Sequence, residues 1–212
     1  MARYLDLVVI ATDDERIAEE ARSFGARVRM TRADHASGTD RVAEVASADA
    51  AGIVVNIQGD EPLIDPAAID AAIQPVVDEP AIQMATLSKR IEDLREIADP
   101  NVVKVVTDRF QNAVYFSRAP IPHVRAGGEN PVFFKHTGLY VYRREFLLRY
   151  PDLPVGPLEQ AERLEQLRAL ENGFKIRVVE TEYESFGVDT PEDLERARYL
   201  FERLPEIIHK NG

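Results

Sequence analysis

The chain has 212 residues, 45% hydrophobic and 30% charged, which is enough for one large hydrophobic core. Its 26 basic and 37 acidic side chains give a formal net charge of −11, which disfavours a general nucleic-acid binder because such proteins need a basic face. The absence of cysteine excludes disulfides, thiol catalysis and cysteine metal sites. No apolar run approaches the roughly 18 residues of a membrane span, and the start of the chain lacks the features of a secretion signal. We therefore expect a soluble, cytoplasmic protein.

Predicted strands and helices alternate in the first half of the chain. Thr12 and Glu15 have the spacing of a capping box, which predicts a helix that stops at Gly25. Further helices are expected near residues 39–46 and from Pro66 to about residue 77. Apolar, often β-branched runs predict strands at residues 5–11, 53–57, 84–87 and 102–106, and a short strand is expected at residues 27–30. This alternation predicts an α/β fold, a mostly parallel sheet with helices on both faces.

The middle of the chain has a different pattern. Residues 113–116 and 133–142 are predicted strands, and the loop between them is rich in proline and glycine. This arrangement predicts a β-rich, hairpin-like lobe at about residues 113–150, inserted into a single domain that spans residues 1–212.

The last third of the chain is predicted to contain two helices and one strand. Leucine and alanine recur every three residues over 158–170, which predicts one amphipathic helix that ends at Asn172 and Gly173. One strand is expected around Ile176 and Val178. Thr190 is the expected cap of the final helix, with proline at its first position.

Three polar loops follow predicted strands, where open α/β sheets bind their ligands. In the first, residues 31–41, Ser37 and Gly38 would present hydroxyl and main-chain N–H groups at a helix N-terminus, which suits an anion or a polar base edge. Arg32 and Arg41 add positive charge nearby. The alternative is that Ser37 only caps a helix.

The other two loops each contain an aspartate. Asp60 follows the buried strand at 53–57, and Asp189 precedes the cap of the final helix. Because Mg²⁺ commonly takes one or two protein carboxylates and fills its other positions with phosphate oxygens and water, the pair is a candidate metal site. Turn geometry alone could also explain either residue.

Four other residues are candidates for binding a polar substrate. His136 and Tyr140 occupy alternate positions of one strand, so their side chains share a face that suits a polyhydroxy compound. Arg118 ends a strand and could pair bidentately with a carboxylate. Glu159 opens a helix, where the helix dipole explains it equally well. A lone histidine is more often structural than a ligand.

Taken together, these motifs resemble the 3-deoxy-manno-octulosonate cytidylyltransferases. The similarity spans nearly the whole chain, from about residue 5 to residue 200, and follows the family's order. The matching stretches are residues 31–41, 56–62, 101–106, 115–118, 136–140, 157–160, 164–168 and 187–194. Single motifs occur in other nucleotidyltransferases, but the set is specific to this family.

The resemblance implies a Rossmann-like nucleotidyltransferase fold and a reaction in which CTP and the eight-carbon acid sugar Kdo give CMP-Kdo and pyrophosphate for lipopolysaccharide assembly. It implies that Asp60 and Asp189 hold Mg²⁺ as the catalytic pair, and that Ser37, Gly38 and Arg41 lie near the nucleotide, beside Asp60. The residues implied around Kdo are Gln58, Arg118, His136, Tyr140, Glu159 and Glu162. The family is usually a homodimer that contacts through the inserted lobe.

The start of the sequence departs from the family pattern. The family begins with a strand and a Pro-Ala-Arg…Ser…Arg…Lys loop that grips the triphosphate, and this sequence begins near the end of the family's first helix, at residues 2–4. We therefore expect a truncated or misassigned reading frame that binds CTP poorly and turns over slowly or not at all. The alternatives are a cytidylyltransferase for another acid sugar, an inactive ligand-binding or dimerising remnant, and a hydrolase that uses the two aspartates.

Overall fold

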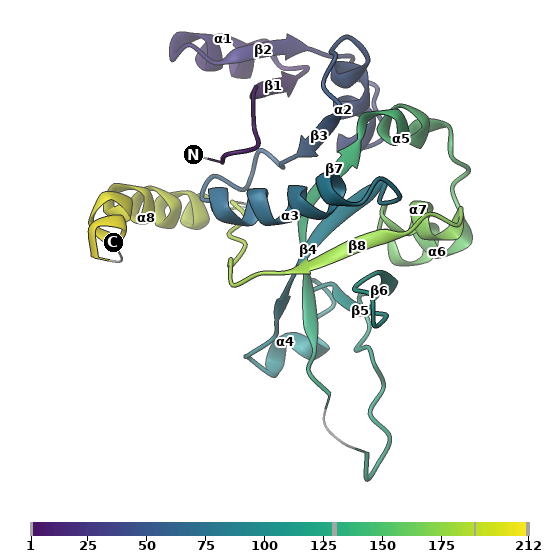
Figure 1. Cartoon of the computed structure of the whole chain (residues 1–212). Coiled ribbons are helices and arrows are strands. Elements are labelled where there is room, and N and C mark those ends of the chain that lie inside the picture. The colour runs from purple at the N-terminus through teal and green to yellow at the C-terminus, as the bar shows by residue number, and fades with distance from the viewer. Residues whose placement is uncertain (1, 129–130, 189, 211–212) are drawn as a thin grey trace.

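A computed structural model describes residues 2–128, 131–188 and 190–210, with only the backbone described for 204–210 (Figure 1). Within these ranges, six strands form the main sheet, in the order β6-β5-β7-β4-β8, and β3 also pairs with β7. Their bounds are β3 (Ile53–Asn56), β4 (Met84–Arg90), β5 (Lys104–Thr107), β6 (Ala113–Ser117), β7 (Phe134–Arg143) and β8 (Ile176–Glu180).

Strand β7 determines the arrangement of this sheet. It runs antiparallel to β3 on one side and to β4 on the other, and β4 and β8 are parallel. Strand β5 is antiparallel to both β6 and β7. Strands β3, β4, β5 and β8 therefore share one direction, but most described neighbours in the sheet are antiparallel. The α/β class is confirmed, and the expectation of mostly parallel pairing is corrected because the returning strand β7 lies between strands that would otherwise be neighbours.

The first two strands form a separate small sheet. Strand β1 (Val9–Thr12) pairs in parallel with β2 (Arg27–Met30), and α1 (Glu15–Ser23) connects them at the top of Figure 1. In the described part of the chain, no strand pairing joins this sheet to the main one. The cap of α1 is Asp14, whose carboxylate accepts from the Arg16 N–H at 2.8 Å, so the predicted capping box at Thr12 is wrong. Thr12 instead accepts from the Asp14 N–H.

Helices cover both faces of the main sheet, as the alternating pattern predicts. Helix α3 (Pro66–Asp78) packs on the face that carries Ala85 and Leu87 of β4, while Met84 joins the core on the other face. That second core includes α2 (Gly38–Ser47), α5 (Arg144–Arg149) and the 3₁₀ turn Tyr150–Asp152. Successive strand residues point to opposite faces, so one strand contributes to both cores.

The predicted amphipathic helix over 158–170 is wrong, because two short helices take its place. Helix α6 (Pro157–Glu162) ends at Arg163, whose φ of 53° is left-handed, and α7 (Leu167–Glu171) follows. Residues spaced three apart move steadily around a helix with 3.6 residues per turn. One straight helix would therefore turn these side chains towards more than one contact surface. The predicted stop is confirmed, since Asn172 caps α7 and Gly173 has a φ of 80°.

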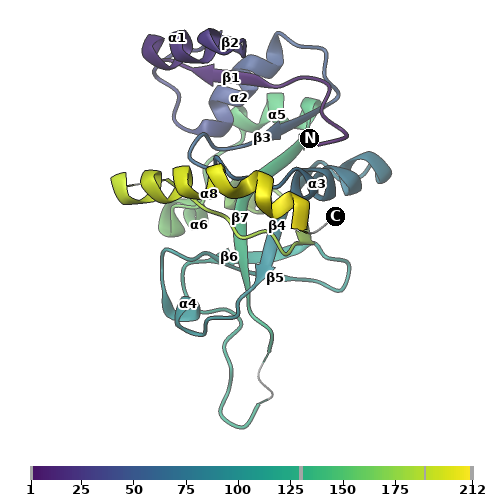
Figure 2. The same ribbon diagram turned by 90° about the vertical axis from the view of Figure 1, so that its left-hand side faces the viewer.

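The remaining elements lie at the edges of the molecule. Helix α4 (Arg95–Ala98) precedes β5, and α8 (Pro191–Lys210) begins after Thr190, whose hydroxyl accepts from the Asp193 N–H as its predicted capping role requires. The described parts of the connection between β6 and β7, residues 118–128 and 131–133, extend far from the sheet at the bottom of Figure 2. The division into a domain and a lobe at 113–150 stays a prediction. Within the described ranges, no helix is long and apolar enough to cross a membrane.

Candidate active site

The turn before α2 meets the end of β3. Ser37 caps α2, and its hydroxyl accepts from the Asp40 N–H at 3.2 Å. A Cβ at Gly38 would lie 3.4 Å from Gln58 Oε1, so the main chain there packs directly against the glutamine side chain. Gln58 in turn donates to Asn56 Oδ1 at 3.1 Å. The structure therefore brings together Ser37, Gly38 and Gln58, which the resemblance assigns to two different substrates.

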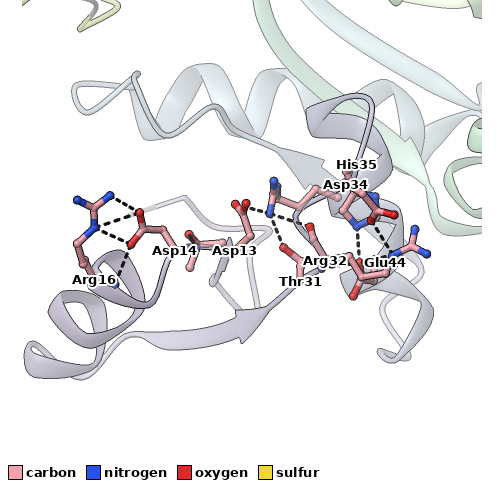
Figure 3. Close-up of polar contacts among 10 residues, drawn as sticks. Asp13, Asp14, Arg16, Thr31, Arg32, Asp34, His35 and Glu44 are labelled. Atoms are coloured by element: carbon pink, nitrogen blue, oxygen red, sulfur yellow. Dashed lines mark hydrogen bonds and ion pairs between the residues drawn. The ribbon is translucent and has the colours of Figure 1, made fainter.

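Arg41 connects α2 with the small sheet. Its Nη1 atom lies 2.8 Å from Asp13 Oδ1 and donates to Thr31 Oγ1. Close by, His35 hydrogen-bonds to Glu44, as Figure 3 shows. The positive charge of Arg41 is thus offset by a carboxylate in this structure, and the residue fixes the position of α2 relative to β1.

A cavity of about 620 Å³ opens between α2 and α6. It is lined by Ser37 and Gly38 from one side and by Glu159 and Arg168 from the other. Glu159 is buried, and both of its carboxylate oxygens are held by Arg168, at 2.9 Å from Nε and 2.7 Å from Nη2. This bidentate pair explains Glu159 better than a helix dipole does, because the carboxylate is oriented by a specific partner.

Glu165 lines the same cavity and was not singled out from the sequence. Its carboxylate accepts from the Thr39 hydroxyl at 2.5 Å, and burial raises its pKa. The sequence feature that indicates such a role is a glutamate within the leucine-rich segment 164–170, because a carboxylate that is buried requires a polar partner.

Arg118 and Glu162 lie together near the end of β6. The Glu162 carboxylate accepts from the Ser117 hydroxyl at 2.6 Å and from the Arg118 N–H at 2.9 Å. The Arg118 guanidinium donates to the main-chain carbonyls of Glu162 and Pro100, both at 2.9 Å. Arg118 therefore pairs with carbonyl oxygens here, and Glu162 orders the turn that carries it.

Lys104 supports this turn and was not predicted to have a role. Its side chain is fully buried, and its ammonium donates to the carbonyls of Asp99, Val102 and Arg118 at 2.8, 2.5 and 2.7 Å. Burial lowers the pKa of Lys104, since desolvation disfavours its charged form.

His136 and Tyr140 share one face of β7, with ring centroids 5.4 Å apart. Desolvation lowers the pKa of His136 to about 3, so the ring is neutral at pH 7. Its Nε2 lies 2.9 Å from the Thr86 hydroxyl, which itself lies 2.7 Å from the Leu139 carbonyl. Because the single hydroxyl proton goes to that carbonyl, His136 donates through Nε2, and Nδ1 is left to accept.

The Asp60 loop is tied to the segment before α8. The Asp60 side chain is exposed and makes no hydrogen bond or ion pair with another described residue. Its main-chain carbonyl accepts from the Val188 N–H at 2.9 Å. The neighbouring Glu61 carboxylate accepts from the Tyr183 hydroxyl at 2.9 Å and from the Phe186 N–H at 3.2 Å.

The predicted partner of Asp60, Asp189, lies outside the described residues. Among the residues that are described, no cluster of three or more His, Asp or Glu side chains could hold a metal ion. Val188, which precedes Asp189 in the sequence, nevertheless contacts the Asp60 loop through its main-chain N–H.

Comparison with known proteins defines the class of this fold and site. Residues 2–176 match the family model described as "Cytidylyltransferase", so the chain belongs to the cytidylyltransferase family. Within it, the chain belongs with the 3-deoxy-manno-octulosonate cytidylyltransferases. It is 72% identical to the protein of that name from Solibacter usitatus (strain Ellin6076), over 95% of this chain and 80% of the relative. It is 58% identical to that of Syntrophotalea carbinolica (strain DSM 2380 / NBRC 103641 / GraBd1), over 92% of this chain and 81% of the relative.

A solved structure agrees with this assignment. The structure of CMP:2-keto-3-deoxy-manno-octonic acid synthetase complexed with CTP superimposes with a TM-score of 0.90 and 44% sequence identity, covering 96% of this chain and 83% of that one.

Proposed function

We propose that this chain transfers CMP from CTP to Kdo, forming CMP-Kdo and releasing pyrophosphate. The observation that carries this proposal is that Ser37 and Gly38 line the same cavity as Glu159. By resemblance the first two lie against the cytosine and the third lies against the acid sugar. Because this cavity is lined by residues proposed for each substrate, the two substrates can meet there. Relatives that are 72% and 58% identical to this chain carry the name of this activity.

The chemistry requires positioning more than covalent help from the protein. A sugar hydroxyl attacks the α-phosphorus in line, and pyrophosphate leaves. In this proposal Ser37 and Gly38 seat the base, while Glu159, Tyr140 and the free Nδ1 of neutral His136 accept or orient sugar hydroxyls. Arg118 and Gln58 complete the sugar side, and Arg41 lies beside the nucleotide.

Asp60 and Asp189 would hold Mg²⁺, which supplies charge neutralisation on the phosphates when it is bound. Asp60 fits this role because its carboxylate is exposed and has no partner among the described residues. Support for the pairing comes from the hydrogen bond between Val188 and the Asp60 carbonyl. Without a cation, two carboxylates and a triphosphate would repel one another in a chain with a net charge of −11.

Two further properties complete the proposal. The chain acts as a homodimer that contacts through residues 113–150, as the family resemblance implies, and light scattering coupled to size exclusion measures this. It acts in the cytoplasm, as the sequence analysis expects.

Pyrophosphate release with CTP, Kdo and Mg²⁺ tests the function, with mass spectrometry of the product. We expect CMP-Kdo to form with CTP and Kdo, and to fall when EDTA removes the metal or when another acid sugar replaces Kdo. The absence of any CMP-Kdo at high enzyme and substrate concentrations would overturn the proposal.

A further inference from the structure

Helix α7 holds the first turn of α6 through two side chains. The Glu171 carboxylate accepts from the main-chain N–H groups of Leu158 and Glu159, both at 2.9 Å. Arg168, one turn earlier in α7, binds both carboxylate oxygens of Glu159. The main chain and the side chain of Glu159 are therefore fixed by separate residues of the same helix.

The fit around Glu171 leaves no room for a larger neighbour. A Cβ built on Gly156 would lie 2.3 to 2.4 Å from the Glu171 carboxylate, far inside van der Waals contact. The carboxylate can bond to the first turn of α6 only because residue 156 has no side chain. Gly156 and Glu171 thus act as one unit.

Arg168 is anchored from the opposite side by the core. Its guanidinium lies over the Tyr150 ring, 5.2 Å from the ring centroid. Tyr150 is fully buried, and its hydroxyl donates to the Glu165 carbonyl at 2.5 Å. This anchoring fixes the plane of the guanidinium, and the bidentate geometry then fixes the plane of the Glu159 carboxylate.

We infer that Arg168 and Glu171 are positioning residues that set the affinity for the acid sugar by orienting Glu159 at the cavity wall. This inference rests on the proposed function, in which Glu159 contacts the sugar. Each carboxylate oxygen of Glu159 has a second lone pair beyond the one that Arg168 uses, so the oriented carboxylate can still accept sugar hydroxyls. Arg168 also offsets the negative charge of Glu159, which would otherwise repel the carboxylate of an acid sugar.

The first test uses Glu171→Gln, which places an amide NH₂ against one of the two N–H donors. We expect the KM for Kdo to rise about 5-fold or more while the KM for CTP stays within about 2-fold. Hydrogen exchange at the amides of Leu158 and Glu159 should accelerate, which reports on the contact whether or not the enzyme turns over. Glu19→Gln is the matched control, because Glu19 is exposed on α1 and far along the chain from this contact.

A double-mutant comparison separates this contact from general loss of packing. Gly156→Ala alone should displace Glu171 and raise the KM for Kdo as Glu171→Gln does. In a Glu171→Ala background the same substitution should add little, because its collision partner is gone. If the effects of the two substitutions on the KM for Kdo were fully additive, the inferred coupling between Gly156 and Glu171 would be overturned.

Arg168→Lys keeps the charge but loses the two-pronged geometry, and Arg168→Gln loses both. We expect the KM for Kdo to rise about 10-fold in the first and more in the second, with circular dichroism confirming folded protein. Equal rises in the KM values for CTP and Kdo would overturn the positioning role, and so would a lower Tm with an unchanged KM for Kdo. Neither result would overturn the proposed function. A wild-type chain that releases no Kdo-dependent pyrophosphate would instead overturn the proposed function, and the role in sugar affinity with it.

Discussion

The main-chain N–H of Val188 donates to the carbonyl oxygen of Asp60 at 2.9 Å, which joins the loop after β3 to the segment that leads into α8. Glu61 reinforces this junction, because its carboxylate accepts from Tyr183, Ser185 and Phe186 of that segment. A carboxylate that receives several donors from one segment fixes both its position and its direction. The geometry of the proposed metal site therefore depends on a residue that is not itself a proposed ligand.

Replacing Glu61 with alanine should weaken this junction. The Tyr183 hydroxyl and the Phe186 N–H would lose their acceptor, which should reduce the free energy of unfolding by about 1–3 kcal/mol. Urea titration measures this loss. Under the proposed function, the half-saturating Mg²⁺ concentration for pyrophosphate release should also rise. Glu182→Ala is the control, since Glu182 is exposed on the same segment; equal effects in both variants would contradict the role of Glu61.

Asp60→Asn should separate activity from stability. Because the Asp60 side chain is exposed and has no partner among the described residues, the free energy of unfolding should change by less than about 0.5 kcal/mol. Turnover should fall about 100-fold or more if the carboxylate holds the metal. Paired urea and pyrophosphate assays check both values, beside Asp152→Asn at another exposed position. Near-normal turnover at saturating Mg²⁺ would rule out Asp60 as a required ligand.

Lys104→Met should have the opposite profile, a large loss of stability. The substitution leaves the carbonyls of Asp99, Val102 and Arg118 without their donor, at a cost of about 2–4 kcal/mol. Thermal and urea unfolding measure the loss. The exposed Lys175→Met should change stability by less than about 0.5 kcal/mol. A Lys104→Met protein as stable as the wild type would show that the desolvation cost of the buried ammonium is as large as the stabilisation from its hydrogen bonds.

Local sequence patterns predicted those features of the fold that depend only on interactions between neighbouring residues. Ser37 caps α2 and Gly173 ends α7 because each needs only its immediate neighbours to do so. Thr12 failed as a cap because Asp14, two residues on, competes for the same role and can bond to the Arg16 N–H. The position of β7 between β3 and β4 depends on pairings between distant segments, which periodicity does not encode.

The same distinction applies to the site. Alternation along β7 was enough to place His136 and Tyr140 on one face. It could not show that Arg168 would pair with Glu159, because that contact requires α6 and α7 to be separate helices. Lys104 and Glu61 were missed for a related reason: their partners are mostly main-chain or distant groups that no local motif marks.

The depressed pKa of His136 predicts a pH-dependent stability. Desolvation holds the folded-state pKa at about 3, below its ordinary value of 6.5, so the unfolded chain binds a proton first as the pH falls. The stabilising contribution is therefore complete above pH 6.5 and declines from there towards pH 3, with a slope of at most about 1.4 kcal/mol per pH unit. Subtracting the unfolding free energy of His136→Gln from that of the wild type, between pH 4.5 and 7.5, isolates this term from the carboxylates. His123→Gln, at an exposed loop position, should keep the wild-type slope. A difference between wild type and His136→Gln that stays constant across this range would show that His136 titrates normally in the folded protein.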